Sequence, residues 1–583
     1  MTSQETLARM LFEFSYWHAM QNAPFKPRAY QLASESVMAL GPEVERAWKH
    51  GGVKALKDLP GIGQSIAEKI DEYFRTGHVK EYEAIKKIMP VDIWGLSRID
   101  GMGPKHIFEL WQYLRIKNLS ELERAVSQHR IRALDGFGEK SEEKIAHSLG
   151  LLKSATGRHL LGEILPIADV IVTKLSRVPG VKRCTYAGSL RRRQETVGDI
   201  DLLATAVHSK KVMDAFVQLP EVESVHERGA TRSSVRLTIG IDADLRVVPD
   251  KVYGATLQYF TGDQRHNILL REQAIEQGYK LNEYGLFKGK KLLVCKTEEA
   301  IYQKLGLETP PPELRVGHEE LLAAREHRLP NLIPYGSVKG DLQTQTNWTD
   351  GEASIEDMAR AAKQHNLGYI AITDHTKSLA FIGGLDDRRV REQAHEIDRL
   401  NKTTSKQRAR LLKGSEVDIR ADGSLDLSNA ALAELDWVGV SVHSSFTMTE
   451  SVMTKRIIKA MAHPSVDCLF HPTGRLIGKR EPYALDMAAI IAAAKQYRVA
   501  LEIDASPPRS DLKDLHVRMA VEAGVPLVID TDAHAPDQFR FIPLGEAIAR
   551  RGWATKADII NIKTLPALRA WLEKKRPRPR WTA

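Results

Sequence analysis

The sequence has little cysteine and no long apolar run. Its 583 residues include three scattered cysteines, Cys184, Cys295 and Cys468. They fit neither a disulfide framework nor a zinc cluster, so we expect a reducing, cytoplasmic setting. No apolar run is long enough to span a bilayer, which argues against a membrane partner. Residues 1–13 lack a basic segment followed by an apolar stretch, so no secretory signal is expected.

Positive charge is in moderate excess. Lysine and arginine number 84 against 75 aspartates and glutamates, a net charge of +9. A basic balance favours a polyanionic partner, although a solvated basic surface is the commoner explanation. The basic tail, residues 574–580, is expected to be disordered, and either to touch DNA non-specifically or only to aid solubility. The length predicts several domains.

One glycine pattern occurs three times in the first 150 residues, which otherwise have helical periodicity. Each copy is a tight turn before a helix, and the glycine pairs are Gly61 and Gly63, Gly101 and Gly103, and Gly136 and Gly138. Glycine lets the backbone approach a ligand closely, and the following helix offers free N–H groups. Such a turn binds a DNA phosphate without reading sequence. The three copies resemble helix-hairpin-helix motifs and predict nucleic-acid binding.

Phe25-Lys26-Pro27-Arg28-Ala29-Tyr30 precedes the first hairpin, and Ala67-Glu68-Lys69 lies in its second helix. Together these segments resemble the small lyase domain of family X DNA polymerases. The resemblance implies that Lys69 forms a Schiff base with deoxyribose phosphate, that Lys26 holds the 5′-phosphate, and that Tyr30 belongs to the DNA-binding surface. A lysine nucleophile needs a lowered pKa. The alternative is a surface lysine on an amphipathic helix.

The strongest chemical pattern lies between residues 188 and 244. Gly188-Ser189 precedes Asp199-Ile200-Asp201, which is predicted to be a strand with both carboxylates on one face. Asp244 follows on a predicted neighbouring strand, with Asp242 as an alternative on the same face. Three carboxylates on adjacent strands can hold two Mg²⁺ or Mn²⁺ ions for phosphoryl transfer.

These motifs resemble the palm of a nucleotidyltransferase, and the string 257–285 resembles the thumb of family X DNA polymerases. The resemblance implies that the incoming deoxynucleoside triphosphate is bound by Gly188, Ser189, Arg192, Tyr259, Phe260, Gly262 and Asn267. Arg246 and Arg271 are then expected to contact DNA. Two residues depart from the family: Arg193 stands where glycine is common, and Asp263 where serine is usual. The charge of Asp263 is expected to weaken nucleotide affinity.

From Gly336 onward, short apolar runs alternate with helical segments, and several of these runs end in residues of metal-ligand type. Ligands at the carboxyl ends of successive parallel strands predict a (β/α) barrel with a metal site. The pattern resembles the polymerase-and-histidinol-phosphatase (PHP) domain, a distorted barrel that acts as a phosphoesterase or 3′–5′ exonuclease. The matching ligands are Asp350, His375, Glu416, His443, His471, Asp532 and His534.

The barrel departs from this family at its first ligands. Gln343 and Gln345 replace the two histidines of the opening His-x-His, and Asp504 replaces an asparagine. A glutamine carbonyl is a weak ligand for Zn²⁺ or Mn²⁺ compared with imidazole. We therefore expect at least one metal position to be lost and nuclease activity to be weak or absent.

The resemblance covers essentially the whole chain and predicts six segments. They are a helix-hairpin-helix lyase-like domain (1–80), a helical fingers-like region with the other two motifs (81–150), an α+β palm (151–257), a thumb (258–314), a linker with one helix (315–335) and the PHP barrel (336–583).

The implied function is filling of short gaps in DNA during repair, by a monomer at the bacterial nucleoid that binds gapped or primer-template DNA. Two alternatives stay open. One is a DNA-tethered PHP phosphoesterase or 3′–5′ exonuclease with a minor polymerase role. The other is a gap-binding scaffold in which neither site is active.

Overall fold

The computed structural model describes residues 3–40, 42–59, 61–99, 101–134, 136–155, 158–317, 319–379, 382–402 and 407–575. Residues 576–580 of the predicted basic tail lie outside this range, as do Pro60, Asp100 and Asp135 of the three hairpins. The chain divides into two compact units, residues 1–157 with 478–480, and residues 158–477 with 481–583. Among the described helices, we find none with the length and apolar character of a membrane span.

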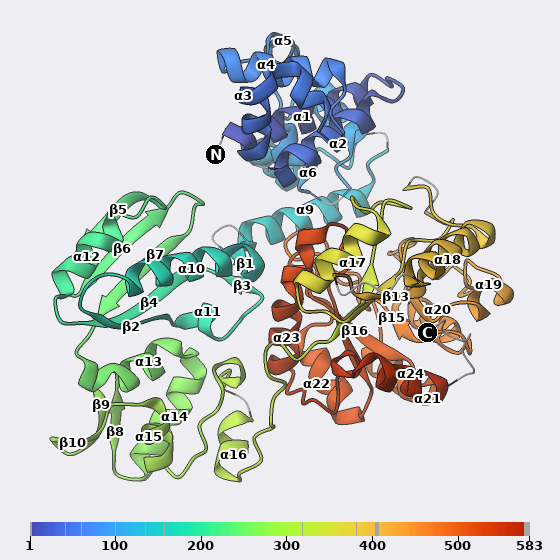
Figure 1. Ribbon diagram of the computed structural model, residues 1–583. Helices are drawn as coiled ribbons and strands as arrows, with labels where there is room; N and C mark the ends of the chain where they lie inside the picture. The colour runs from blue at the N-terminus through green and yellow to red at the C-terminus, as the bar shows by residue number, and fades with distance from the viewer. Residues whose placement is uncertain are drawn as a thin grey trace. The chain divides into compact units, whose positions relative to one another are not determined.

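The first unit is helical, as the sequence predicts (Figure 1). Its helices are α1 (Ser3–Met20), α2 (Lys26–Leu40), α3 (Pro42–Lys57), α4 (Gln64–Thr76), α5 (Lys80–Ile88), α6 (Ile93–Ser97), α7 (Pro104–Leu114), α8 (Leu119–Ser127) and α9 (Glu139–Ala155). They enclose two hydrophobic cores. One draws its buried residues from Leu7 to Ile85 and the other from Met89 to Leu149. The predicted division at residue 80 lies close to this change of core and stays a prediction.

The second unit begins with a five-stranded mixed sheet in the order β2-β4-β7-β6-β5. Its elements are β1 (His159–Leu160), α10 (Leu161–Ser176), β2 (Val181–Tyr186), α11 (Gly188–Arg191), β3 (Thr196–Val197), β4 (Asp199–Ala206), α12 (Ser209–Val217), β5 (Val222–Arg228), β6 (Arg232–Leu237) and β7 (Asp242–Val247). Ile200 and Leu202 of β4 are buried, so Asp199 and Asp201 lie on the opposite face. Strand β6 ends at Leu237, because the chain turns at Gly240 before β7 begins.

The next segment has a three-stranded antiparallel sheet in the order β10-β9-β8, with helices packed around its own core. The elements are α13 (Tyr253–Thr261), α14 (Gln264–Glu276), β8 (Lys280–Asn282), β9 (Gly285–Lys288), β10 (Lys291–Val294) and α15 (Glu298–Lys304). The predicted linker contains one helix, α16 (Glu320–Arg325).

The C-terminal segment is a seven-stranded parallel sheet whose spatial order follows the chain order from β11 to β17. The strands are β11 (Gly340–Thr344), β12 (Tyr369–Ile372), β13 (Arg410–Asp418), β14 (Trp437–Ser441), β15 (Cys468–Leu469), β16 (Ala500–Asp504) and β17 (Leu527–Asp530). A parallel bridge between Thr344 and Ala533 joins the first strand region to the last, so the sheet nearly closes. This is the distorted barrel that the sequence predicts.

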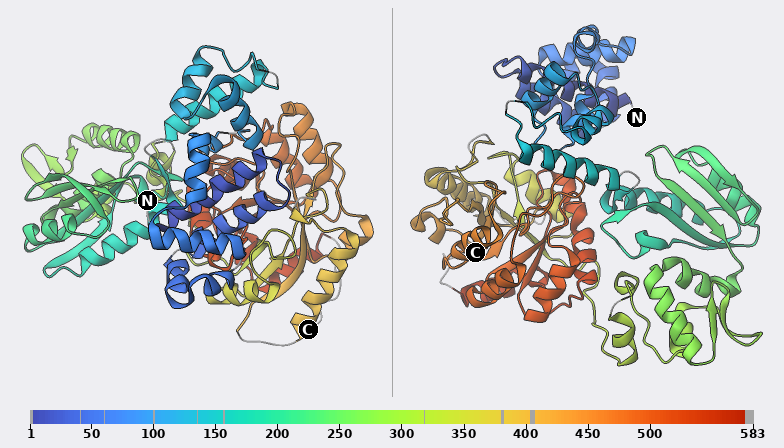
Figure 2. Two further views of the ribbon diagram at one scale, coloured as in Figure 1. Left: turned by 90° about the horizontal axis from the view of Figure 1, so that it is seen from above. Right: turned by 180° about the vertical axis from the view of Figure 1, so that it is seen from behind.

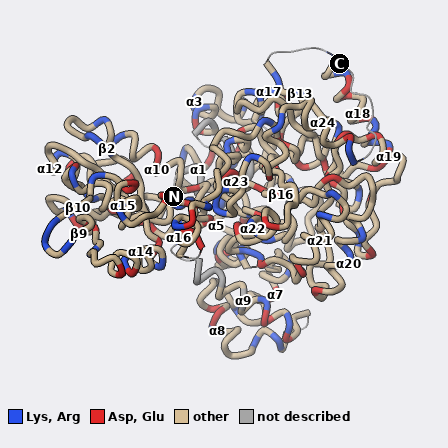
Figure 3. The backbone as a smooth tube through the Cα atoms, turned by 90° about the horizontal axis from the view of Figure 1, so that it is seen from below, with Lys and Arg blue, Asp and Glu red and all other residues tan. Residues whose placement is uncertain are grey.

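Helices surround the barrel strands (Figures 1 and 2). They are α17 (Ile355–Gln364), α18 (Asp387–Lys402), α19 (Asn429–Ala433), α20 (Glu450–Met461), α21 (Met487–Tyr497), α22 (Asp514–Ala523), α23 (Ile542–Arg551) and α24 (Leu565–Glu573). Strands and helices share a large core of aliphatic residues, as alternating β and α elements require. Basic and acidic residues are interspersed along the backbone (Figure 3).

Candidate functional site: two carboxylate centres on one chain

The predicted polymerase carboxylates lie on two neighbouring parallel strands. In the β4–β7 pairing, Asp199 stands beside Asp242 and Asp201 beside Asp244. Asp242 is half exposed and its Oδ1 accepts a hydrogen bond from Arg236 at 2.9 Å. Asp244 is less exposed, and its buried Oδ1 has no hydrogen-bond partner within the described residues. Asp244 is therefore the better placed third ligand.

The surroundings of these carboxyls raise their pKa values. Burial raises the pKa of Asp201 to about 7, and the neighbouring Asp199 and Asp244 add to this effect. Burial also raises the pKa of Asp199, again with a contribution from Asp244. Carboxyls crowded in this way favour a divalent cation, because its charge offsets their mutual repulsion. The donor set, three carboxylates with an unpartnered oxygen, fits hard divalent cations.

The Gly188-Ser189 turn comes close to this centre. Gly188 has φ of +57°, and a Cβ at this position would meet Asp201 Oδ2 at 2.3 Å. Only glycine therefore allows the turn to approach the carboxylate. The turn, Asp199 and Asp201 border a pocket of about 480 Å³ together with residues of the following segment. The pocket also contains Arg192, Tyr259, Phe260, Gly262, Asn267 and Arg271.

Residues of α13 and α14 are held by specific contacts at this pocket. Asn267 Nδ2 donates to the Tyr259 carbonyl at 2.7 Å, and the side chain of Gln258 donates to Asn267 Oδ1 at 2.8 Å. The Arg246 guanidinium lies 4.5 Å from the centre of the Phe260 ring. Asp263 caps α14, since its Oδ1 accepts from the His266 N–H at 2.8 Å. The Asp263 carboxylate thus caps the helix, a role that serine can also have. The expected effect of its charge on nucleotide affinity stays a prediction.

Two arginines at this centre carry no signal in the sequence. Arg158 borders the same pocket and is hydrogen-bonded to the Thr196 carbonyl at 2.7 Å. Arg232 on β6 lies 3.7 Å from Asp244. Neither belongs to a recognisable motif, and only the fold brings them to the carboxylates.

The turn is also tied to the thumb-like segment through a buried ion network. Arg191 donates two hydrogen bonds to Glu298, at 2.9 and 2.6 Å, and Arg315 also contacts this carboxylate at 2.5 Å. Burial alone would raise the pKa of Glu298, but Arg315 and Arg191 outweigh it and lower the value to about 2. Arg192 donates to the Thr261 carbonyl. The two segments that form the pocket are therefore fixed to each other.

The three glycine hairpins share one geometry. Gly61, Gly101 and Gly136 all have positive φ, between +71° and +83°. Gly63 and Gly103 are extended residues that cap α4 and α7, and nothing lies within 4 Å of a Cβ built on either. Gly138 is equally open. The second glycine of each pair thus leaves room for a phosphate at the start of the helix.

Lys69 lies in an aromatic and acidic setting. Its ammonium pairs with Glu81 at 2.9 Å and lies 5.9 Å from the Tyr30 ring. Burial lowers the pKa of Lys69, but hydrogen bonds to Glu81 and Tyr30 outweigh burial and leave the pKa above its ordinary value. Lys26, which is exposed, begins α2 nearby. The lowered pKa that a Schiff-base lysine needs is absent from the described structure, and the lyase hypothesis stays untested.

The predicted PHP ligands converge beyond the barrel strands. Ligand atoms of Asp350, His375 and His534 lie within 4.8 Å of one another, as do those of His375, Glu416 and His443. Both groups fit a metal ion. Glu416 lies within β13, which continues to Asp418 because β14 pairs with it throughout residues 414–418.

Two other predicted ligands make different contacts. His471 Nε2 lies 2.8 Å from Glu416 Oε1. Asp532 lies 3.4 Å from the Arg509 guanidinium, which is equally close to Asp504. Arg509 carries no signal in the sequence, because it lies within a loop and away from any ligand motif. The guanidinium supplies a positive charge to the two carboxylates beside the centre.

Gln343 and Gln345 point their amide nitrogens toward the carboxylate of Glu416. Nε2 of Gln343 and of Gln345 donate to Glu416 Oε2, at 3.2 and 2.9 Å. Their carbonyl oxygens are buried without a hydrogen-bond partner among the described residues. Amide carbonyls are weaker ligands for Zn²⁺ or Mn²⁺ than imidazole, and both amide groups here donate to Glu416. This corner therefore fits a metal ion less well than the two histidine groups do.

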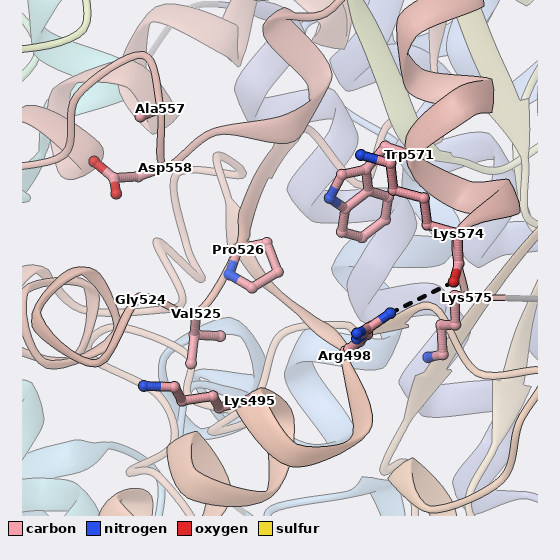
Figure 4. Close-up of a pocket in the computed structure, with 10 residues that line it drawn as sticks. All are labelled: Lys495, Arg498, Gly524, Val525, Pro526, Ala557, Asp558, Trp571, Lys574 and Lys575. Atoms are coloured by element: carbon pink, nitrogen blue, oxygen red, sulfur yellow. Dashed lines mark hydrogen bonds between the residues drawn. The ribbon is translucent and has the colours of Figure 1, made fainter.

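A separate pocket of about 460 Å³ lies away from these ligands (Figure 4). Val525 and Pro526 directly precede β17, so the pocket is at the amino end of that strand. Lysines 495, 574 and 575, Arg498 and Trp571 also line it. The metal ligands lie at the carboxyl ends of the strands, so this pocket is not part of the metal centre.

Comparisons with known families match most of these segments. Residues 3–79 match a helix-hairpin-helix domain, and residues 95–150 match a SAM-like helix-hairpin-helix tandem. Residues 256–316 match the DNA polymerase beta thumb, and residues 341–505 match the PHP domain.

Curated relatives match different shares of the chain. The chain is 24% identical to DNA polymerase lambda of Rattus norvegicus over 51% of its length and 56% of the relative. For DNA polymerase lambda of Arabidopsis thaliana the identity is 26%, over 45% of the chain and 54% of the relative. It is 35% identical to "DNA polymerase/3'-5' exonuclease PolX" of Bacillus subtilis (strain 168), over 96% of this chain and 97% of the relative. The chain therefore belongs to the PolX family of DNA polymerases, which join helix-hairpin-helix and polymerase-beta-like segments to a PHP domain.

Proposed function

We propose that this protein is a DNA-directed DNA polymerase that fills short gaps in DNA. The observation that carries the proposal is the register of β4 and β7, which sets Asp201 beside Asp244 and next to the Gly188-Ser189 turn. A nucleotidyl transfer needs acidic ligands, a triphosphate site and a nucleoside site in one pocket. The pocket at Gly188, Asp199 and Tyr259 offers all three.

Three groups of residues have roles in the proposed reaction. Asp199, Asp201 and Asp244 would hold two Mg²⁺ or Mn²⁺ ions, which activate the primer 3′-hydroxyl and screen charge on the triphosphate. The Gly188-Ser189 turn and Arg192 would hold the triphosphate, as backbone N–H and guanidinium donors suit phosphate oxygens. Tyr259, Phe260 and Asn267 would contact the sugar and base.

The substrates follow from the same site and from the helical unit. Deoxynucleoside triphosphates and gapped or primer-template DNA are the proposed substrates. The six hairpin glycines, with Arg246 and Arg271, are the proposed DNA contacts. We propose that the protein acts as a monomer at the bacterial nucleoid.

The PHP centre has a second, reduced function in this proposal. The two histidine-containing groups could hold Zn²⁺ or Mn²⁺, while the Gln343–Gln345 corner offers amide donors to Glu416. A family-type centre that has lost one of its metals is expected to cleave DNA 3′ ends slowly. The relative in Bacillus subtilis carries the term 3'-5' exonuclease in its name, so the activity belongs in the test.

Extension of a primer across a one-nucleotide gap tests the polymerase function. Wild type should fill the gap, and Asp201→Ala should reduce the rate at least about a hundredfold, as loss of a transition-state charge partner does. The matched control is Asp242→Ala, which removes a carboxylate from the same strand face and should retain most activity. No extension by wild type, with rapid loss of 3′ nucleotides instead, would favour the phosphoesterase alternative. Inactivity in both assays with tight gap binding would favour the scaffold.

A further inference from the structure

The segment 193–198 joins the two halves of the proposed nucleotide site. Ser189 and Arg192 precede it, and Asp199 follows it. A shift of this segment would therefore move the triphosphate turn relative to the acidic centre. The segment contacts the polymerase-like part, where Arg193 donates to the Tyr186 hydroxyl at 2.8 Å and Val197 lies in the core of the mixed sheet. It also contacts two arginines of the PHP barrel.

Arg475 of the barrel binds the side chain of Glu195. Its guanidinium donates two hydrogen bonds to the carboxylate, at 3.3 and 2.7 Å. The same guanidinium donates to the carbonyls of Arg509, at 3.0 Å, and Ser510. Arg475 is 8% exposed. A buried arginine with bidentate geometry and filled donors holds its partner in a defined position.

Arg551, at the end of α23, binds the backbone of the same segment. The guanidinium donates to the Arg193 carbonyl and, through Nε, to Asp514 at 3.0 Å. Arg193 has φ of +54°, a conformation that favours glycine. Its side chain lies 5.3 Å from the Tyr186 ring and 5.8 Å from the Tyr335 ring. These contacts hold the strained residue between the sheet and the barrel.

Apolar packing also joins the barrel to the mixed sheet. Leu544 of α23 belongs to the hydrophobic core of the mixed sheet. A Cβ on Gly162 of α10 would meet the Pro507 side chain at 2.5 Å, so helix and barrel loop are in close contact. The barrel therefore packs against the mixed sheet and α10, and Arg475 and Arg551 reach from it to segment 193–198.

We propose that the PHP barrel positions the triphosphate turn and Asp199 for nucleotide addition, with Arg475 and Arg551 as the positioning residues. The inference rests on the proposed polymerase function and gives the barrel a role in synthesis that does not require its own metals. Misplacement of a reacting group by about 1 Å costs on the order of a hundredfold in rate. We call the contacts of Arg475 and Arg551 with segment 193–198 the clamp. Loss of one of these contacts should thus impair nucleotide incorporation without unfolding the chain.

Steady-state gap filling by Glu195→Gln in the full-length protein tests the clamp. The change keeps the shape of the side chain but removes the charge that Arg475 binds. The KM for the deoxynucleoside triphosphate should rise about 5- to 20-fold, because the triphosphate turn and Asp199 are no longer held in position. The affinity for gapped DNA and the melting temperature should match wild type, which a merely structural role would not predict.

A double-mutant cycle with Arg475→Gln shows whether the two residues act through each other. The double variant should have a KM close to that of a single variant, because coupled residues do not add. Arg420→Gln is the matched control, since it breaks a barrel ion pair of 2.9 Å with Asp426 and does not touch segment 193–198. It should leave the KM unchanged.

Three results would overturn the proposal. They are an unchanged KM in Glu195→Gln, additive effects in the cycle, and a loss of activity that follows the melting temperature. A wild-type protein that extends no primer would overturn both the clamp and the polymerase function, whereas an active wild type with an insensitive KM would overturn only the clamp.

Discussion

Asp201 is the residue whose surroundings have the clearest chemical consequence. Its carboxyl is buried beside Asp199 and Asp244, which raises its pKa to about 7. The metal-free folded protein therefore keeps a proton there that the unfolded chain releases near the ordinary value of 3.8. This site thus lowers folding stability as pH rises from the unfolded to the folded pKa. A bound cation would remove the penalty by stabilising the ionised form.

Cation binding at this centre should therefore depend on pH. Below the pKa of about 7 for Asp201, a proton must leave before a cation binds, so Mn²⁺ affinity should fall about tenfold per pH unit. Above that pKa the affinity should level off. Titration calorimetry of the wild type across this range measures the dependence, and Asp242→Ala should retain it. An affinity independent of pH below the pKa would contradict the assignment.

At the scale of elements, the glycine hairpins show how far local sequence determines conformation. Each turn needs one residue with positive φ and one open residue before a helix, and Gly61 with Gly63 meets both needs. The strand β4 is equally local, because alternation of Asp199, Ile200, Asp201 and Leu202 separates polar from apolar faces. The extent of β13 was not predictable in this way, since β14 pairing extends it past Glu416.

Replacement of the open hairpin glycines should weaken DNA binding without altering sequence preference. Gly103→Glu places a carboxylate where a phosphate would lie, at the start of α7. Loss of phosphate contacts lowers affinity uniformly and reduces its salt dependence. Fluorescence anisotropy with gapped DNA at several salt concentrations measures both effects. Gly150→Glu is the control, since a Cβ there also meets nothing within 4 Å and the residue lies within α9 instead of at a hairpin. The affinity of this variant should stay near wild type, and equal losses would remove the hairpin interpretation.

For the whole molecule, the PHP barrel combines a retained fold with an altered centre. The parallel strands and two groups of side chains that could hold a metal ion are in place, yet Gln343 and Gln345 donate to Glu416. A barrel core of aliphatic residues does not depend on its metals, so the fold can persist when a ligand is lost. The contacts of Arg475 and Arg551 with segment 193–198 offer a reason for a polymerase to retain it.

Restoration of the two histidines tests this view of the centre. The variant Gln343→His with Gln345→His replaces amide donors by imidazole ligands, which bind Zn²⁺ and Mn²⁺ far better. It should bind at least one more metal ion per chain and degrade DNA 3′ ends at least about tenfold faster than wild type, in line with the cost of removed metal-site groups. Elemental analysis and an exonuclease assay measure the two effects, with Asp201→Ala as background to exclude synthesis. Equal metal content in both proteins would contradict the prediction.

The sequence by itself determined the domain types, the hairpin turns, the two polymerase strands and most of the candidate metal-binding side chains. These features depend on alternation, glycine conformation and short spacings, which are properties of neighbouring residues. Only the tertiary structure decided that Asp244 rather than Asp242 has the freer carboxylate, that Lys69 pairs with Glu81, and that Arg475 reaches Glu195. Contacts between residues distant along the chain depend on how elements pack, and no local pattern specifies that packing.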